Sequence, residues 1–157
     1  MALFLSRYDN KVDKKGRVSV PAPYRTALAA QSFPGIVAYP SPVSDAIECC
    51  GMDRMERLAA GIETFNPFSD EFGAFATAIL SRAHQLSFDS EGRVVLPEPL
   101  LSHAGVAELA TFAGRGPVFQ IWNPDAYAAY EREASLQARE QAGQLALAQQ
   151  LGAGGAT

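Results

Sequence analysis

The fold of this chain follows from one stretch, Asp13-Lys14-Lys15-Gly16-Arg17-Val18-Ser19-Val20-Pro21, because the pattern occurs twice. The second copy, 76 residues later, is Asp89-Ser90-Glu91-Gly92-Arg93-Val94-Val95-Leu96-Pro97. Both copies follow Asp-x-x-Gly-Arg-Val-x-aliphatic-Pro, and in each a second proline follows two residues further on. The match predicts two repeated structural units within the 157 residues.

Each copy has the residues of a tight turn between two strands. Aspartate is favoured at the first position of a type I turn, and glycine at the fourth, where a positive φ is required. We therefore expect two hairpins, with Asp13 opposite Arg17 in the first and Asp89 opposite Arg93 in the second. The returning strand of the first hairpin alternates, with Val18 and Val20 on one face and Arg17 and Ser19 on the other, which predicts one buried and one outward face.

Composition indicates a globular protein with 48% hydrophobic and 19% charged residues. No apolar run reaches membrane length, and the first residues lack the pattern of a signal peptide. Cys49 and Cys50 are adjacent, so they cannot join distant segments and lack zinc-ligand spacing. No catalytic motif is present, and His84 and His103 lie in different contexts. We expect a cytoplasmic protein that is not an enzyme and uses no metal, cofactor or small-molecule substrate.

The charge is unevenly distributed along the chain. Residues 1–25 hold six basic and two acidic residues, a net charge of +4, whereas the remainder holds seven basic and fifteen acidic residues, a net charge of −8. A basic end on an acidic body suggests a site for a polyanion. A solvated charged surface is the simpler alternative.

The remaining segments predict the same order in each half: strand, turn, strand, short helix after proline, two strands, helix. A helix beginning after Ser69 should turn four side chains inward: Phe72, Phe75, Ala76 and Ile79. The last helix could run from Asp125 to about Leu151, and residues 152–157 suggest a disordered tail. The expected domains are a first repeat (1–80), a second repeat (81–135) and a C-terminal helical extension with a flexible tail (136–157).

The segment Arg7 to Pro21 (RYDNKVDKKGRVSVP) resembles the start of the MraZ family, bacterial transcriptional regulators of the division and cell-wall gene cluster. The second motif and residues 118–125 also match that family. The resemblance implies an α+β fold with a mostly β core, an AbrB-like swapped-hairpin double-split β-barrel with peripheral helices. It also implies a homo-oligomeric ring, association with the nucleoid, and binding to short direct repeats in double-stranded promoter DNA as a repressor.

The repeats differ in the residues that could contact DNA. Between Asp13 and Arg17 the net charge is +2, and between Asp89 and Arg93 it is −1. Arg17 keeps its charge as Arg93, but the other basic residues at aligned positions of the first repeat become neutral or acidic in the second, so we expect the first turn to face DNA. The family's role maps onto Asp13 and Arg17, and the candidate DNA-binding residues are Arg7, Lys11, Asp13, Lys14, Lys15 and Arg17.

Individual residues keep alternative interpretations. Lys14 and Lys15 are interpreted as phosphate contacts, and Arg17 could contact a base or a phosphate. Asp13 and Arg17 could equally form a structural pair, since the aspartate also explains the turn. In the second repeat three residues are assigned to structure: Asp89, Gly92 and Arg93. Replacement of Ser19 by Val95 suggests that the outer strand face is covered in the second repeat.

A protein-interaction module is the rival interpretation, because the implied fold also occurs in antitoxins that grip a toxin with an appended segment. The helix from Asp125 onward could be such a segment. It is rich in Glu, Gln and Ala and offers few large apolar anchors.

Overall fold

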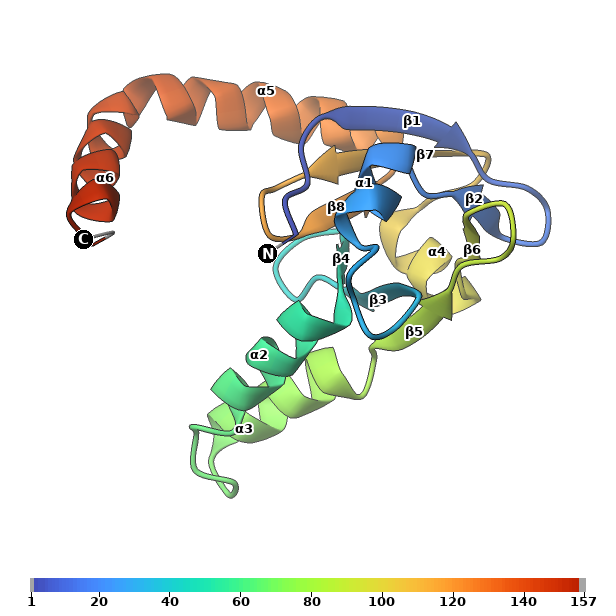
Figure 1. Ribbon diagram of the computed structural model, residues 1–157, viewed down its shortest axis with the longest axis horizontal. Helices are drawn as coiled ribbons and strands as arrows, with labels where there is room; N and C mark the ends of the chain where they lie inside the picture. Colours follow the sequence, from blue (N-terminus) through green and yellow to red (C-terminus); the bar gives the residue numbers. More distant parts are fainter. Residues whose placement is uncertain (1, 156–157) are drawn as a thin grey trace. The chain divides into compact units, whose positions relative to one another are not determined.

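The computed structural model describes residues 2–155 and contains a six-stranded sheet, a two-stranded ribbon and several helices (Figure 1). The sheet has the order β1-β7-β8-β4-β3-β5, the ribbon pairs β2 with β6, and every pairing is antiparallel. The strands are β1 (Arg7–Lys11), β2 (Arg17–Ser19), β3 (Gly35–Pro40), β4 (Ile47–Cys50), β5 (His84–Ser87), β6 (Arg93–Val95), β7 (Leu109–Gly114) and β8 (Phe119–Trp122).

The chain divides into two compact units, Met1–Pro124 and Asp125–Thr157. The α+β class with a mostly antiparallel core is confirmed; the barrel detail and the domain boundaries at residues 80 and 135 stay predictions.

The helices are α1 (Ala22–Ala27), α2 (Met52–Ile62), α3 (Asp70–Phe75), the π-helical turn η1 (Ala76–Leu80), α4 (Glu98–Ala104), α5 (Pro124–Glu140) and α6 (Ala142–Gly155).

The two repeats exchange strands with each other. Strand β1 of the first repeat pairs along its whole length with β7 of the second, and β5 of the second repeat pairs with β3 of the first. The central pair, β4 with β8, also joins the two repeats. Each half therefore completes its share of the sheet with a strand from the other half.

A local two-fold relationship governs these pairings. In the ribbon Val18 lies opposite Val94, which is its equivalent in the repeat, and both side chains are buried. In the sheet Glu48 lies opposite Gln120, its equivalent when residues 46–53 are aligned with residues 118–125. A two-fold axis relates equivalent residues to each other, so both pairs lie on the same pseudo-axis.

The two turns form as predicted, but the prediction that each turn joins two strands paired with each other is wrong. Within the first repeat a single bridge, Val12 with Val18, joins the two sides of the turn. Beyond it β1 and β2 separate, β1 to pair with β7 and β2 with β6. Separation lets Val18 and Val94 pack between the layers, whereas an isolated two-stranded hairpin has no second layer to cover its apolar face.

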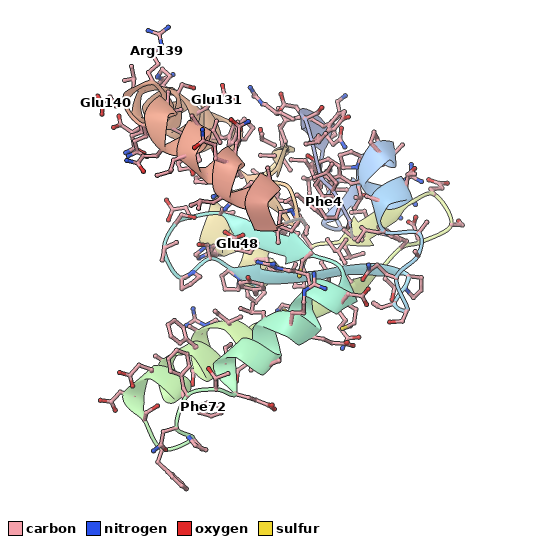
Figure 2. The ribbon with its side chains drawn as sticks, turned by 60° about the vertical axis from the view of Figure 1, so that its left-hand side comes forward. Phe4, Glu48, Phe72, Glu131, Arg139 and Glu140 are labelled. Carbon is pink, nitrogen blue, oxygen red and sulfur yellow. The ribbon has the colours of Figure 1, made fainter. Side chains whose placement is uncertain are left out.

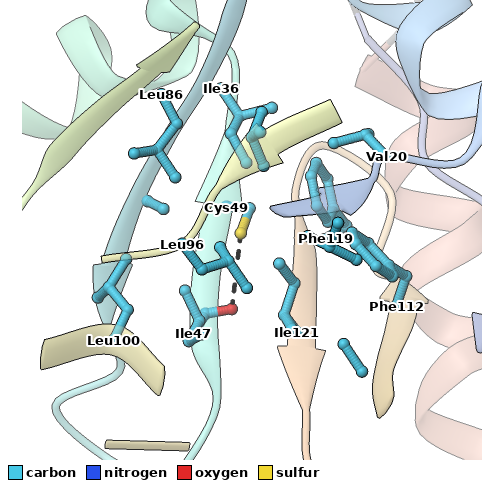
Figure 3. Packing of buried hydrophobic residues seen from close by; sticks show 14 of the residues in the cluster. Val20, Ile36, Ile47, Cys49, Leu86, Leu96, Leu100, Phe112, Phe119 and Ile121 are labelled. Carbon is cyan, nitrogen blue, oxygen red and sulfur yellow. Dashed lines mark hydrogen bonds between the residues drawn. The ribbon is translucent and has the colours of Figure 1, made fainter. Parts of the chain in front are cut away.

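The larger core cluster joins side chains of the sheet to side chains of the ribbon, α1 and α4. Four aromatic rings meet there: Phe4 lies 4.9 Å from Phe119, which lies 4.8 Å from Tyr24 and 6.1 Å from Phe112. Aliphatic side chains from both repeats fill the rest of the cluster (Figure 3). A smaller cluster that includes Val37, Cys50 and Met55 packs with the helices after β4.

Three helical predictions need correction. The Ser69 side chain does cap α3 by accepting a bond from the Phe72 N–H, and Ile79 is buried, but Phe75 is 38% exposed. The reason is that α3 extends beyond the strands and packs beside α2, while η1 reaches β3 (Figure 1). The long last helix is interrupted at Gln141. Helix α6 continues to Gly155 instead of ending in a tail, and residues 156–157 lie outside the described part.

Among residues 2–155 no helix is long and apolar enough to cross a bilayer.

The strand exchange predicts that neither repeat folds alone. A fragment of residues 1–80 would lose β7, β8 and β5, and with them the partners of β1, β4 and one edge of β3. We expect the fragment to aggregate or remain unfolded in circular dichroism and thermal melting. Mixing it with residues 81–157 should restore a cooperative melt. A soluble 1–80 fragment that melts cooperatively would contradict the prediction.

Candidate nucleic-acid interface

The first turn is organised by one carboxylate. Oδ1 of Asp13 accepts hydrogen bonds from the backbone N–H groups of Lys15 (2.9 Å) and Arg17 (2.8 Å). Oδ2 accepts from Nε of Arg17 at 2.6 Å. Gly16, with φ +82°, allows the chain to reverse, and its N–H donates to the Asp13 carbonyl at 3.0 Å. The aspartate therefore both closes the turn and fixes the arginine side chain.

The second turn repeats this geometry. Asp89 accepts from the backbone N–H groups of Glu91 and Arg93, each at 2.9 Å, and from Nε of Arg93 at 2.9 Å. Gly92 has a φ of +77°. The predicted structural role of Asp89, Gly92 and Arg93 agrees with these contacts, and the same contacts give Asp13 a structural role in the first turn.

The two turns are also bonded to each other's strands. The carbonyl of Gly16 accepts from the N–H of Leu96 at 2.8 Å, and the carbonyl of Gly92 accepts from the N–H of Val20 at 3.2 Å. A Cβ added to Gly16 would lie 2.8 Å from the Leu96 carbonyl oxygen, so a larger residue would disrupt this close approach. Each turn is therefore held by the opposite repeat.

The arginines differ at the outer end of the guanidinium group. Nη2 of Arg93 lies 3.4 Å from the carboxylate of Glu91, within its own turn. The equivalent neighbour of Arg17 is Lys15, whose side chain cannot accept a hydrogen bond. Within residues 2–155 the contacts of the Arg17 side chain are to Asp13 through Nε, so its two terminal nitrogens remain available to an acceptor outside the chain.

Strands β2 and β6 present a common outer face. Their pairing places Arg17 beside Val95 and Ser19 beside Arg93, while the intervening valines face the core. Val95 is 53% exposed, so the prediction that this face is covered in the second repeat is wrong within the chain. In an antiparallel pair diagonal neighbours lie about 7–8 Å apart, which places the two arginines at about that spacing.

The remaining predicted residues divide into two groups. Lys11, Lys14 and Lys15 are exposed at the end of β1 and in the turn, close to Arg17 in the chain. Arg7 is exposed at the start of β1, four residues before Lys11, and forms an ion pair with Asp9 at 3.3 Å. A strand rises about 3.4 Å per residue, so Arg7 is separated from the turn by most of the length of β1.

Arg25 belongs to the same surface and was not among the predicted site residues. Its Nε donates to the carbonyl of Val20 at 3.1 Å, and its guanidinium covers the second turn, with Cζ 2.6 Å from the position of a Cβ on Gly92. The equivalent residue, Leu101, lies against Gly16 in the first turn. Alignment of the repeats pairs Arg25 with Leu101, so the sequence shows that the charge at this position differs between the repeats. It does not show that the Arg25 side chain lies against the turn of the other repeat.

The hydrogen bonds of the turns shift the titration of their acidic groups. The backbone N–H of Arg17 has the largest effect in lowering the pKa of Asp13, and that of Arg93 does the same for the pKa of Asp89. The bond to Asp89 raises the pKa of Arg93. Both carboxylates are therefore ionised at neutral pH.

The two cysteines and His103 lie in surroundings that favour a structural role. Burial raises the pKa of the Cys49 thiol well above its usual range and that of Cys50 to about 11, which disfavours the reactive thiolate. Nε2 of His103 lies 3.1 Å from the carbonyls of both Ser44 and Ala46. In the part of the chain that is described, no group of three or more His, Cys, Asp or Glu side chains could hold a metal ion.

Comparisons with known proteins find relatives that cover most of the chain. The family described as "MraZ protein, putative antitoxin-like" matches residues 79–148. The protein named transcriptional regulator MraZ from Rickettsia felis is 51% identical over 89% of this chain and 94% of its own length. The proteins of the same name from Rickettsia akari and Rickettsia bellii are 49% and 48% identical over 90% and 89% of this chain, and over 95% and 94% of their own lengths.

An antiparallel core with a basic turn on an exposed ribbon, together with these relatives, defines a transcriptional regulator. The chain belongs to the MraZ family. A regulatory family agrees with the expectation that the protein is not an enzyme.

The lowered pKa values predict that the two aspartates stabilise the fold in a pH-dependent way. A carboxylate with a pKa depressed by folding adds stability above its unfolded value of about 3.8, and this contribution is lost as the pH falls through the folded value. Asp13→Asn and Asp89→Asn should therefore melt below the unchanged chain at pH 6, with the difference shrinking as the pH falls through the lowered folded values. Asp45→Asn, at an exposed loop position, is the control. Melting differences that do not change with pH would contradict the prediction.

Proposed function

We propose that the protein is a sequence-specific DNA-binding repressor whose first turn reads the operator. The observation that supports this most is the contrast between two turns of equal geometry. Both hold an arginine by Nε, but the carboxylate of Glu91 forms an ion pair with the outer end of Arg93, whereas Lys15 leaves the outer end of Arg17 available. Both turns need the aspartate–arginine pair for their geometry, so the geometry does not account for the difference in charge between them. Binding of DNA by the first turn alone would account for it.

The chemistry of the first turn suits DNA. A guanidinium offers two parallel N–H groups that match O6 and N7 of guanine, and a two-stranded ribbon fits the major groove. Asp13 limits the rotation of the Arg17 side chain, which reduces the entropy lost on binding. Lys11, Lys14 and Lys15 are exposed around it and would contact phosphates, which set affinity but not sequence.

One turn supplies too few contacts for a specific operator, so we propose that subunits act together. The family resemblance implies a homo-oligomeric ring and short direct repeats in the promoter. Linking identical sites makes each further contact intramolecular and can raise avidity by roughly 10²–10⁴. The acidic remainder of the chain, with a net charge of −8 beyond residue 25, would disfavour contact with DNA elsewhere on the surface.

The proposed target is the bacterial division and cell-wall gene cluster, including the promoter of the protein's own gene, so the protein would act in the cytoplasm at the nucleoid. A gel-shift experiment with DNA from just upstream of its own gene tests this proposal. We expect discrete complexes that survive an excess of unrelated DNA. Equal affinity for the two DNAs would contradict sequence-specific binding.

A protein-interaction module is the second candidate. The unit Asp125–Thr157 supports it, because three leucines are exposed along α6, Leu145, Leu147 and Leu151. A module that acts solely through a protein partner would give no complex in the gel-shift experiment. Because the DNA candidate depends on the first turn and the module candidate on the second unit, substitutions in each separate the two.

The equal geometry of the turns provides a matched pair of variants. For each repeat that is bound, Arg17→Ala should reduce the preference for operator over unrelated DNA about 5- to 150-fold, the equivalent of losing one bidentate base contact of about 1–3 kcal/mol. Arg93→Ala removes the same bond to an aspartate and should leave the preference unchanged. Fluorescence anisotropy with operator and scrambled duplexes measures both. An equal reduction in both variants would assign Arg17 to structure.

Lys15→Glu provides a stricter test, because it gives the first turn the residue that holds Arg93 in the second. We expect the new carboxylate to accept from Arg17 and to reduce specificity as Arg17→Ala does. Lys15→Gln, which removes the charge without adding an acid, should weaken operator and scrambled DNA equally. Identical specificity in the two variants would show that the outer end of Arg17 is not used.

The lysines of the turn should contribute salt-dependent affinity. Lys14→Ala/Lys15→Ala is expected to weaken binding to all DNA sequences and to reduce the slope of log K against log salt by about 0.9 for each phosphate that the variant no longer neutralises. Binding measured at low and at high salt gives this slope. Superimposable curves for the variant and the unchanged chain would remove these lysines from the interface.

The proposed assembly predicts a spacing rule. Neighbouring subunits present identical turns, so the repeats of the operator should be about one helical turn, roughly 10 base pairs, apart and on the same face of the DNA. Insertion of half a turn between intact repeats should weaken binding sharply, whereas insertion of a full turn should weaken it less. Unchanged binding to both DNAs would mean that each subunit binds independently.

A further inference from the structure

The first repeat contains a helical hairpin, formed by α2, α3 and η1, with an open groove in its side. The hairpin extends away from the strands (Figure 1), and Phe72 lies near its far end (Figure 2). The groove has a volume of about 490 Å³, within the range of about 300–1,000 Å³ typical of ligand pockets. Its walls are mainly apolar and include Leu58, Ile62, Phe65, Phe75 and Ile79.

The groove is open beside Gly61, which has no side chain to occupy it. A Cβ added to Gly61 on α2 would meet no atom within 4 Å, so the helix leaves an opening where other residues would place a side chain. Phe65 and Phe75 border it with ring centroids 5.7 Å apart, and each is 38% exposed. Aromatic side chains of this size that remain open to water gain most from being covered.

The loop at the end of the hairpin presents a single large apolar side chain. Phe68 is 97% exposed, although its backbone is hydrogen-bonded within the loop. Its N–H donates to Oδ1 of Asn66 at 2.8 Å, and Oγ of Ser69 donates to the Asn66 carbonyl at 2.6 Å. These bonds order the backbone of the loop with Phe68 facing outward, which lowers the backbone entropy that a bound state would have to offset.

Groove and loop have opposite charges. Arg54 and Arg57 of α2 border the groove, and within residues 2–155 neither forms an ion pair. Asp70 and Glu71 follow Phe68 by two and three residues and are likewise exposed and without an ion pair in the described chain. An aromatic anchor beside two carboxylates matches an apolar groove beside two guanidinium groups.

We propose that Phe68 of one copy of this chain inserts into the groove of the next copy, with Asp70 and Glu71 beside Arg54 and Arg57. Loop and groove are different surfaces, so the contact is heterologous and repeats from copy to copy until a ring closes. The inference rests on the assembly of identical subunits in the proposed function and names its contact. Phe68 acts as the anchor, since one phenylalanine buries about 150–250 Å² of a total near 1,600 Å².

Two variants test the contact from its two sides. Gly61→Met should fill the groove and Phe68→Ser should remove the anchor, so each should reduce the mass measured by light scattering to the 16.8 kDa of one chain. Gly73→Met is the control for the groove, because Gly73 is also helical and also has no atom within 4 Å of an added Cβ. Val43→Ser is the control for the loop, because Val43 is 90% exposed elsewhere. Both controls should keep the mass of the unchanged chain.

Mixing separates a heterologous contact from other arrangements. Gly61→Met retains an intact loop and Phe68→Ser an intact groove, so an equimolar mixture should form a 1:1 dimer and nothing larger. A charge exchange gives a second check: Arg57→Glu and Glu71→Arg should each weaken assembly at least tenfold, and the double variant should restore it. Thermal melting of every variant confirms folding, and Gly61→Met should melt no lower than the unchanged chain because glycine disfavours helix.

The proposal is overturned if the unchanged chain is monomeric at micromolar concentration, if either variant keeps the full mass, or if the mixture stays monomeric. Assembly that survives Phe68→Ser but not Leu145→Ser/Leu151→Ser would place the C-terminal helix in the groove instead, and would also overturn it. These masses are measured without DNA, so they do not depend on the operator. Phe68→Ser and the unchanged chain should bind a duplex with one repeat equally weakly, because a single turn makes the contact. An assembled unchanged chain that shows no preference for the full operator over scrambled DNA would contradict the proposed function alone.

Discussion

The rest of the structure depends on the pairing of β2 with β6. These strands place Val18 against Val94 in the core, and at their ends each turn glycine accepts a hydrogen bond from the strand of the other repeat. Because β2 and β6 are occupied with each other, β1 and β5 must find partners elsewhere, and they complete the opposite half of the sheet. One short ribbon thus fixes the topology of the unit Met1–Pro124.

The two repeats contain turns of equal geometry that differ in their electrostatics. The aspartate–arginine pair is needed in both, since it closes the turn through backbone N–H groups as well as through the side chain. The residue two positions before the arginine is free to change, because it is exposed and bonded through its backbone alone in the first turn. Lys15 and Glu91 occupy this position, and they decide whether the guanidinium end is available or held.

A second asymmetry lies in the segments that come after the central strands. After β4 the chain forms the helical hairpin of α2 and α3 and returns to the sheet, whereas after β8 it continues through α5 into the second unit. The pseudo-two-fold core accordingly carries different additions on its two repeats. A symmetric core with asymmetric additions presents a different surface on each of its two repeats.

The sequence by itself determined the two repeats, the turn geometry around Asp13 and Asp89, the α+β class and the family. These features rest on interactions between residues at most four positions apart or on direct identity with relatives. The tertiary structure decided which strands pair, the position of Arg25 over the other turn, and the exposure of Val95 and Phe75. Those features depend on contacts between residues far apart in the chain, and alternation along a strand specifies a buried face without specifying the partner that covers it.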